Sequence, residues 1–161
     1  MIRMKFIISG KNIDVTDSLR SAVEDKLSKL EKYKVTTFCV PPTMYRMLLE
    51  NDVSKYDLSS LTHCCTAGEA LNPEIYNNWM KATGLKLYEG FGQTETTLCI
   101  ATIYPWSEPN PGAIGFPVPG YDVHILGEDG ESCPRGATGE ICIRVLSQAR
   151  KTCGLLDTYN F

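Results

Sequence analysis

Hydrophobic positions near the start of the chain recur with the spacing of one strand and then one helix. Residues 4–9 (MKFIIS) form an apolar run typical of a β-strand, and turn-forming residues follow it. The next apolar positions repeat every three or four residues: Leu19, Val23, Leu27 and Leu30. This spacing predicts a helix to about Tyr33 with one apolar stripe and an opposite face of lysines. One strand and one helix cannot bury that stripe, so it must pack on another part of the chain or stay loose.

Strands and helices alternate in the next part of the chain. Runs rich in β-branched and aromatic residues predict strands at 35–40, 61–66 and 85–88. Between them, Pro41-Pro42 opens a predicted helix to about Leu49, and a second helix over 73–83 is closed by Gly84. This alternation is typical of an α/β sheet, in which ligand-binding groups are expected where strands end.

The pattern changes again after Pro105, where short strands are separated by glycine and proline turns. Strands are predicted at 123–126 and 141–145, and the Glu-Asp-Gly sequence at 128–130 is typical of a hairpin turn. The expected fold class is therefore α/β: a partial sheet layer with alternating strands and helices, then a small β subdomain, preceded by one grafted strand–helix unit. The corresponding divisions are 1–33, 34–104 and 105–161.

Composition narrows the class of protein. The 161 residues are 43% hydrophobic and 22% charged, which is ordinary for one soluble domain, and the net charge of −3 argues against a DNA-binding protein. The charge is uneven, with a net +3 over residues 1–34 and −6 over the remainder. No apolar stretch is long enough to span a membrane, and the N-terminus does not resemble a signal peptide. Seven cysteines without a C-x-x-C pair predict reduced, mostly buried thiols and a cytoplasmic location.

The densest candidate chemistry lies in residues 88–97, YEGFGQTETT. Glycines on both sides of Phe91 allow the backbone to pass close to a flat ligand on which the ring can stack. Thr94 offers a hydroxyl to a phosphate oxygen, and Glu95 offers a carboxylate to a hard cation such as Mg²⁺. Alone, the segment is equally consistent with a glycine turn before a strand.

Three other blocks, CCTAGEAL, PGAIGFPVPGYDVHIL and GATGEICIRV, accompany this segment in a fixed order. Together the four resemble the adenylate-forming superfamily, and most closely its medium-chain acyl-CoA synthetases, over residues 33–161. The resemblance implies that one stretch lines the nucleotide pocket: Glu89, Gly90, Phe91, Gly92, Gln93 and Thr94. It also implies an adenine-contacting loop at Gly68, Glu69 and Ala70, and a position facing the metal for Glu95.

The same resemblance implies an activity. Members of that family use ATP and Mg²⁺ to activate a carboxylic acid as an acyl-adenylate, and then transfer the acyl group to coenzyme A. The family's phosphate-gripping loop, ribose-binding Asp motif and catalytic Lys are not found in these 161 residues, so no catalytic residue is assigned. We therefore expect a catalytically incomplete part of an acyl-CoA synthetase.

Residues 1–33 carry a different resemblance. MKFIISGKNIDVTDSLRSAVEDKLSKLEKY is similar to the first strand and helix of the ribosome hibernation-promoting factor family, which binds the small ribosomal subunit. This implies, as an alternative, a weak and salt-dependent contact of the segment's basic residues with ribosomal RNA. A chimera with no activity of its own is the third interpretation.

Overall fold

The computed structural model describes residues 17–144, and the strand predicted at 4–9 lies outside that range. The helical elements are α1 (Asp17–Lys32), α2 (Pro42–Leu49), the 3₁₀ helix η1 (Val53–Lys55) and α3 (Pro73–Thr83). The strands are β1 (Thr37–Cys39), β2 (His63–Ala67), β3 (Leu87–Gln93), β4 (Thr97–Ala101), β5 (Phe116–Pro117), β6 (Asp122–Leu126) and β7 (Glu140–Arg144). Helices α2 and α3 begin and end where the sequence predicts.

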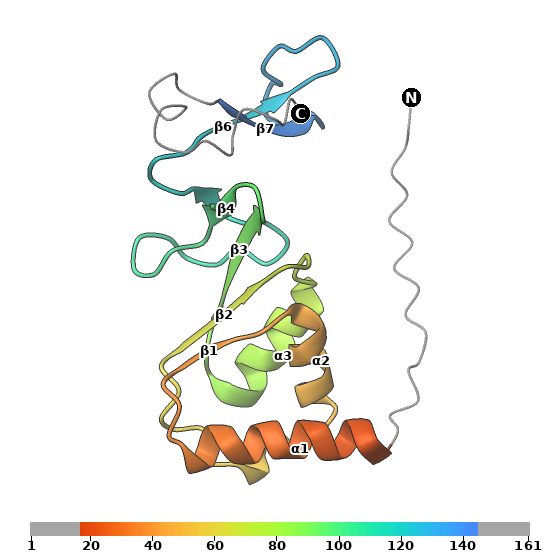
Figure 1. Ribbon diagram of the computed structural model, residues 1–161, viewed down its shortest axis with the longest axis vertical. Helices are drawn as coiled ribbons and strands as arrows, with labels where there is room; N and C mark the ends of the chain where they lie inside the picture. Colours follow the sequence, from red (N-terminus) through yellow and green to blue (C-terminus); the bar gives the residue numbers. More distant parts are fainter. Residues whose placement is uncertain (1–16, 145–161) are drawn as a thin grey trace.

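The strands form two sheets (Figure 1). The larger has the order β1-β2-β3-β4-β5, with parallel pairing from β1 to β3 and antiparallel pairing from β3 to β5. The smaller is the antiparallel pair β6 and β7 at the other end of an elongated molecule. The α/β class with a small second sheet is thus confirmed.

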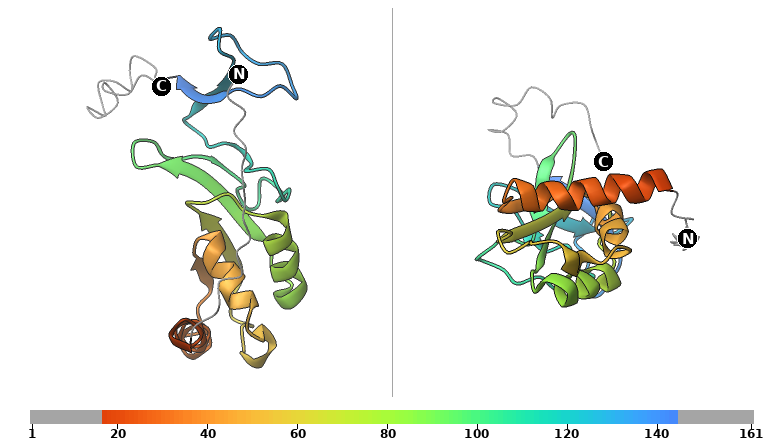
Figure 2. Two further views of the ribbon diagram at one scale, coloured as in Figure 1. Left: turned by 90° about the vertical axis from the view of Figure 1, so that its right-hand side faces the viewer. Right: turned by 90° about the horizontal axis from the view of Figure 1, so that it is seen from below.

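Helix α1 is joined to the main core. Three residues of its predicted stripe, Val23, Leu27 and Leu30, are at most 6% exposed and belong to the same hydrophobic cluster as residues of α2 and α3. Seen from below, α1 crosses the end of the layer formed by the sheet and the other helices (Figure 2, right). The stripe is therefore packed rather than loose.

The core centres on Tyr45 of α2 and Trp79 of α3, both fully buried. Their rings meet edge to face at 4.8 Å, and Phe38 of β1 packs on the other side of Tyr45 at 5.6 Å. The Tyr45 hydroxyl donates to the carbonyl oxygens of Phe38 and Cys65, at 3.2 and 3.1 Å. One side chain thus connects α2 to the two parallel strands β1 and β2.

Local signals in the sequence explain the limits of α3. Asn72 accepts a hydrogen bond from the Glu74 backbone N–H at 2.8 Å, and Pro73 occupies the first turn, where its missing N–H costs nothing. Gly84 ends the helix with φ of 75°, a left-handed conformation that glycine adopts without steric cost. The described helices include none long and apolar enough to cross a membrane.

Two sequence predictions differ from the structure. The strands predicted from the sequence do not include residues 97–101, which form β4. The thiols are less buried than expected: Cys64 and Cys99 are buried, whereas Cys39 is exposed and the three others in the described range are half-buried. They are Cys65, Cys133 and Cys142.

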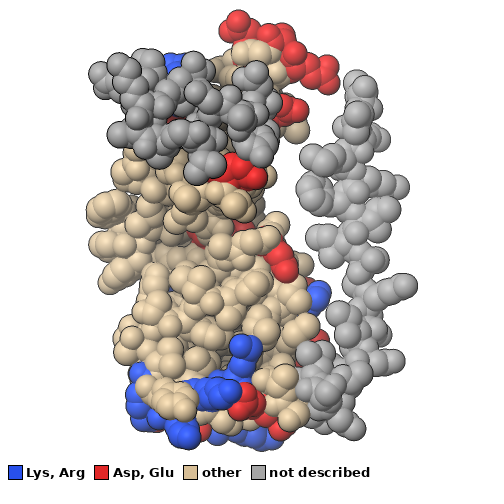
Figure 3. All heavy atoms as spheres, viewed as in Figure 1, with Lys and Arg blue, Asp and Glu red and all other residues tan. Residues whose placement is uncertain are grey.

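The uneven charge predicted from the sequence is visible on the surface (Figure 3). Lysines gather at the end formed by α1, where Lys26, Lys29 and Lys32 are exposed. Acidic side chains collect at the opposite end, over the loop between β6 and β7. Lys29 pairs with Asp25 at 2.7 Å, but because both are exposed this pair adds little to stability.

The burial of α1 predicts that it contributes to the stability of the whole core. Leu27→Ala removes a fully buried side chain and leaves a cavity, so it should lower the free energy of unfolding by about 2–5 kcal/mol. Lys26→Ala, one residue away on the exposed face, should change it by less than about 0.5 kcal/mol. Urea denaturation of both variants measures the difference. Equal effects would contradict the integration of α1 into the core.

Candidate functional site

The glycine-rich segment is largely a strand. Residues 87–93 form β3, which pairs with β2 on one side and β4 on the other. The strand predicted at 85–88 thus continues through the glycines, and the turn before β4 is at 94–96. The pairing shifts register between Phe91 and Gly92, which marks a bulge in the strand.

The bulge explains why residue 92 is a glycine. A Cβ atom at Gly92 would overlap the Thr97 carbonyl oxygen, so no larger residue fits against β4 there. Thr97 itself has a left-handed φ of 54°, which is uncommon for a non-glycine residue. The turn is held by a hydrogen bond from the Gln93 N–H to the Thr96 hydroxyl at 3.0 Å, and by the Tyr121 hydroxyl, which donates to the Thr96 carbonyl.

Glu89 is the buried member of the predicted nucleotide-pocket set, with 7% of its surface exposed. Its carboxylate accepts a hydrogen bond from the Leu71 backbone N–H at 2.9 Å, and its carbonyl accepts from Thr102 N–H at 2.8 Å. Burial raises the pKa of Glu89, and the Leu71 hydrogen bond offsets part of that rise. Glu89 thus joins β3 to the segment that leads into α3.

The predicted adenine loop, Gly68 to Ala70, directly follows β2. Gly68 has φ of 89°, and all three residues are exposed. The Glu69 carboxylate reaches α2, where it accepts from the Thr43 hydroxyl at 2.5 Å and from the Thr43 N–H at 3.3 Å. A carboxylate at this position is favourable because the first turn of a helix has free N–H groups.

Sheet register brings the two predicted segments together at one edge. Thr66 is paired with Glu89 and Ala67 with Gly90, so the loop after β2 leaves the sheet beside the middle of β3. Thr94 and Glu95 lie beyond it, exposed in the turn before β4. The side chains of Glu69 and Glu89 each bind backbone from other segments rather than each other.

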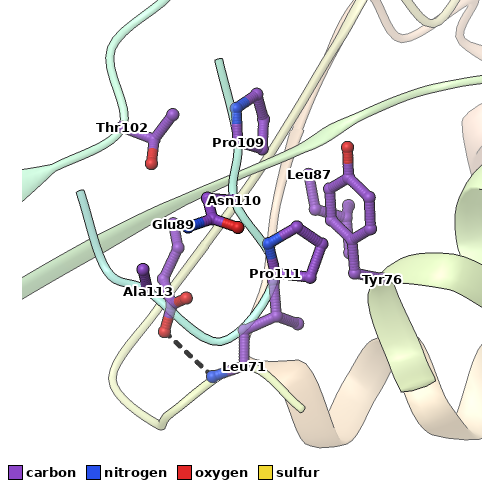
Figure 4. A pocket seen from close by; sticks show the side chains of 9 residues that line it. All are labelled: Leu71, Tyr76, Leu87, Glu89, Thr102, Pro109, Asn110, Pro111 and Ala113. Atoms are coloured by element: carbon purple, nitrogen blue, oxygen red, sulfur yellow. Dashed lines mark hydrogen bonds between the residues drawn. The ribbon is translucent and has the colours of Figure 1, made fainter. Parts of the chain in front are cut away.

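A small pocket lies next to this edge (Figure 4). It is lined by Leu71, Tyr76, Leu87, Glu89, Thr102, Pro109, Asn110, Pro111 and Ala113. Its volume is about 10 Å³, room for roughly one water molecule and far below the roughly 300 Å³ at which ligand pockets usually begin. Glu89 is the one predicted site residue that lines it, so this pocket does not bring the predicted set together.

Among the predicted site residues, Glu95 is the one to which a role in binding a cation is assigned. The described part of the chain contains no group of three or more His, Cys, Asp or Glu side chains that could hold a metal. This arrangement still fits Mg²⁺, which usually keeps several waters and is bound by one or two carboxylates together with substrate phosphates.

Sequence reasoning missed two residues that shape this region. Thr43 binds Glu69, and Tyr121 binds the turn after β3 through both Thr96 and the Thr97 hydroxyl. Thr43 follows a Pro-Pro pair that signals a helix start, so its free N–H could have been noted from the sequence. Tyr121 carries no such signal, because it is 24 residues from Thr97.

A mixed sheet whose parallel strands β1 to β3 pack against helices, with loop segments meeting at one strand edge, defines the general class as an α/β ligand-binding fold. A profile of the AMP-binding enzyme family matches residues 6–150. The chain therefore belongs to the AMP-binding enzyme family.

Curated relatives are acyl-CoA synthetases. The chain is 48% identical over 122 residues to the mouse mitochondrial acyl-coenzyme A synthetase ACSM3, covering 76% of this chain and 21% of the mouse protein. It is 46% identical over 119 residues to the human mitochondrial acyl-coenzyme A synthetase ACSM4, covering 74% and 20%. The chain thus spans about a fifth of the length of these relatives.

Solved structures agree. An anthranilate CoA ligase, AuaEII, in complex with anthranoyl-AMP has a TM-score of 0.70 and 33% identity, covering 76% of this chain and 24% of that one. An acyl-CoA synthetase from Brucella canis has a TM-score of 0.69 and 27% identity, covering 75% and 23%. The predicted similarity to acyl-CoA synthetases is confirmed, whereas these comparisons give no support to the ribosome hibernation factor resemblance of residues 1–33.

The buried carboxyl of Glu89 predicts a pH-dependent stability. Because its pKa in the folded state is raised above 4.5, its contribution to stability is full below about that pH and is lost as the pH rises through the raised value. Glu89→Gln keeps an acceptor for the Leu71 N–H without the charge. The free energy of unfolding of this variant, relative to the parent chain, should therefore increase as the pH rises from about 4.5 to about 7.5.

Urea denaturation across this pH range measures the effect, and Glu140→Gln, at an exposed position on β7, is the matched control. A Glu89→Gln profile parallel to that of the parent chain would show that burial does not perturb this carboxyl.

Proposed function

We propose that this chain is the part of an ATP-dependent acyl-CoA synthetase that contacts the adenine and α-phosphate of the nucleotide. The observation that carries the proposal is the register of β2 and β3, which puts the loop from Gly68 to Ala70 beside the segment from Glu89 to Thr94. Membership of the AMP-binding enzyme family and similarity to a CoA ligase in complex with anthranoyl-AMP support it.

The predicted site residues differ in exposure, and their proposed roles follow from that difference. Phe91 is half-buried on β3, so its ring has a fixed position from which it can stack on adenine. Thr94 and Glu95 are exposed in the turn, where a hydroxyl can donate to the α-phosphate and a carboxylate can face Mg²⁺. Glu89 is buried and hydrogen-bonded to Leu71, so it holds the edge of the site rather than the nucleotide.

The proposed reaction of the whole enzyme has two steps. The oxygen of a medium-chain carboxylate attacks the α-phosphorus of ATP and releases pyrophosphate, and the thiol of coenzyme A then displaces AMP from the acyl-adenylate. Mg²⁺ would supply charge neutralisation at the phosphates. The chain's own part is to orient adenine and the α-phosphate, while the residues that hold the other phosphates belong to motifs absent from these 161 residues.

The two other interpretations, a ribosome-binding module and an inactive chimera, have less support. The lysines of α1 are exposed and could meet RNA phosphates, but the apolar face of the helix is built into the core of the AMP-binding fold. This packing favours one folded unit over a separate ribosome-binding module or an inactive chimera. The cytoplasmic location also stays a prediction, and the curated relatives are named as mitochondrial enzymes.

Stacking by Phe91 predicts a specific loss of nucleotide binding. We expect weak binding of AMP to the full chain, measured by chemical-shift changes in NMR titration. Phe91→Ala should weaken it by roughly 5- to 150-fold, since base–aromatic stacking is worth about 1–3 kcal/mol. Phe116→Ala, which removes a 64% exposed ring from β5, is the matched control and should leave AMP binding unchanged. Equal affinities of the two variants would contradict the assignment of Phe91.

The missing phosphate-gripping motifs predict that this chain has no synthetase turnover. Pyrophosphate release with octanoate, ATP and coenzyme A should stay at the background rate, because losing the groups that position one reactant costs many powers of ten in rate. A full-length acyl-CoA synthetase in the same assay is the positive control. A rate near that of the control would refute the prediction.

A further inference from the structure

Two thiols lie side by side on the sheet face opposite the core. Cys39 of β1 is directly paired with Cys65 of β2, and in a parallel pair such partners point to the same face. Their neighbours Phe38 and Cys64 point the other way and are buried, at 9% and 0% exposure. Cys39, by contrast, is exposed and Cys65 is half-buried. The two thiols therefore form a pair that is accessible in this chain.

The spacing of the strands suits a bond between these sulfurs. Neighbouring strands lie about 4.8 Å apart, within the roughly 4.4–6.8 Å between Cα atoms that a disulfide spans. The two thiols also interact: burial raises the pKa of Cys65 to about 12, with a hydrogen bond to the Cys39 thiol as a further cause. Cys65 is thus held as a protonated thiol beside an exposed partner.

We propose that Cys39 and Cys65 form a redox modification site that closes to an intramolecular disulfide with a low-molecular-weight disulfide as oxidant. The exposed Cys39 thiolate attacks one sulfur of the oxidant, forms a mixed disulfide and releases one thiol. The Cys65 sulfur then attacks the Cys39 sulfur, and the second half of the oxidant leaves as a thiolate that takes up the Cys65 proton and becomes the second thiol. Two electrons pass from the protein thiols to the oxidant, which is reduced to two thiols.

The site has a defined place in the fold. Cys39 is the last residue of β1 and Cys65 is the middle residue of β2. The Tyr45 hydroxyl binds the Cys65 carbonyl and that of Phe38, the residue before Cys39. The disulfide would therefore join β1 to β2 where this side chain already connects them. It requires no nucleotide, so its failure would leave the proposed adenine contacts untouched.

Two other thiols, Cys64 and Cys142, serve as internal controls. Cys64 is adjacent to Cys65 in sequence but fully buried on the opposite face, where burial raises its pKa to about 11. Cys142 lies on β7 in the separate small sheet, opposite His124 of β6. Neither is placed to replace either member of the pair.

The test is oxidation of the native full chain with oxidised glutathione, followed by alkylation and mass spectrometry. We expect a product that carries two fewer alkyl groups than the reduced, alkylated chain, and a tryptic link between the peptides 35–46 and 56–81. Cys39→Ser and Cys65→Ser should each reduce this link at least tenfold, whereas Cys64→Ala should retain it.

Cys142→Ser is a second control that leaves the core intact, in case Cys64→Ala fails to fold, and it should also retain the link. The proposal would be overturned if the native chain gave only glutathione adducts, or if the link persisted in Cys65→Ser through Cys64. A link that formed only in denaturant would overturn it as well, because the native strand pairing would then play no part.

Discussion

The larger sheet and its helices depend on the hydrogen bonds that the buried Tyr45 hydroxyl makes to β1 and β2. Burial raises the pKa of Tyr45, so the hydroxyl keeps the proton that it shares between the carbonyls of Phe38 and Cys65. A buried phenol hydroxyl without such partners would destabilise the fold, because the loss of its hydrogen bonds to water would not be compensated. The hydrogen bonds therefore fix where α2 lies along β1 and β2, and the ring positions Trp79 and, through it, α3.

This arrangement explains how a chain whose sequence suggests two origins forms one core. Helix α1 adds Leu27 and its neighbours to the cluster that already contains Tyr45 and Trp79. An amphipathic stripe needs only an apolar surface of suitable shape, and it carries little information about its partner. The described helix α1 thus has a structural role in the core. The profile of the AMP-binding enzyme family, which begins at residue 6, includes this helix.

The sequence was most informative where structure is decided locally. Pro73 and Gly84 predicted the two ends of α3, because such start and stop signals depend on adjacent residues. The sequence predicts the start of β3, at 85–88, but not its continuation through the glycines, whose low strand propensity is overcome by hydrogen bonds to β2 and β4 on both sides. The contact between Glu69 and Thr43 could not be predicted either, since it joins residues 26 apart whose proximity depends on the fold.

That β3 is a strand changes how the candidate site can work. A loop would have to be ordered by the ligand, at a cost of about 1–2 kcal/mol for each residue fixed. Here the segment from Glu89 to Gln93 is already fixed by pairing on two sides and by the buried Glu89 carboxylate, so Phe91 is positioned before any nucleotide arrives. Thr94 and Glu95 are exposed in the turn that follows. Under the proposed function, the paired strand would orient the adenine and the exposed turn would face the phosphate and the cation.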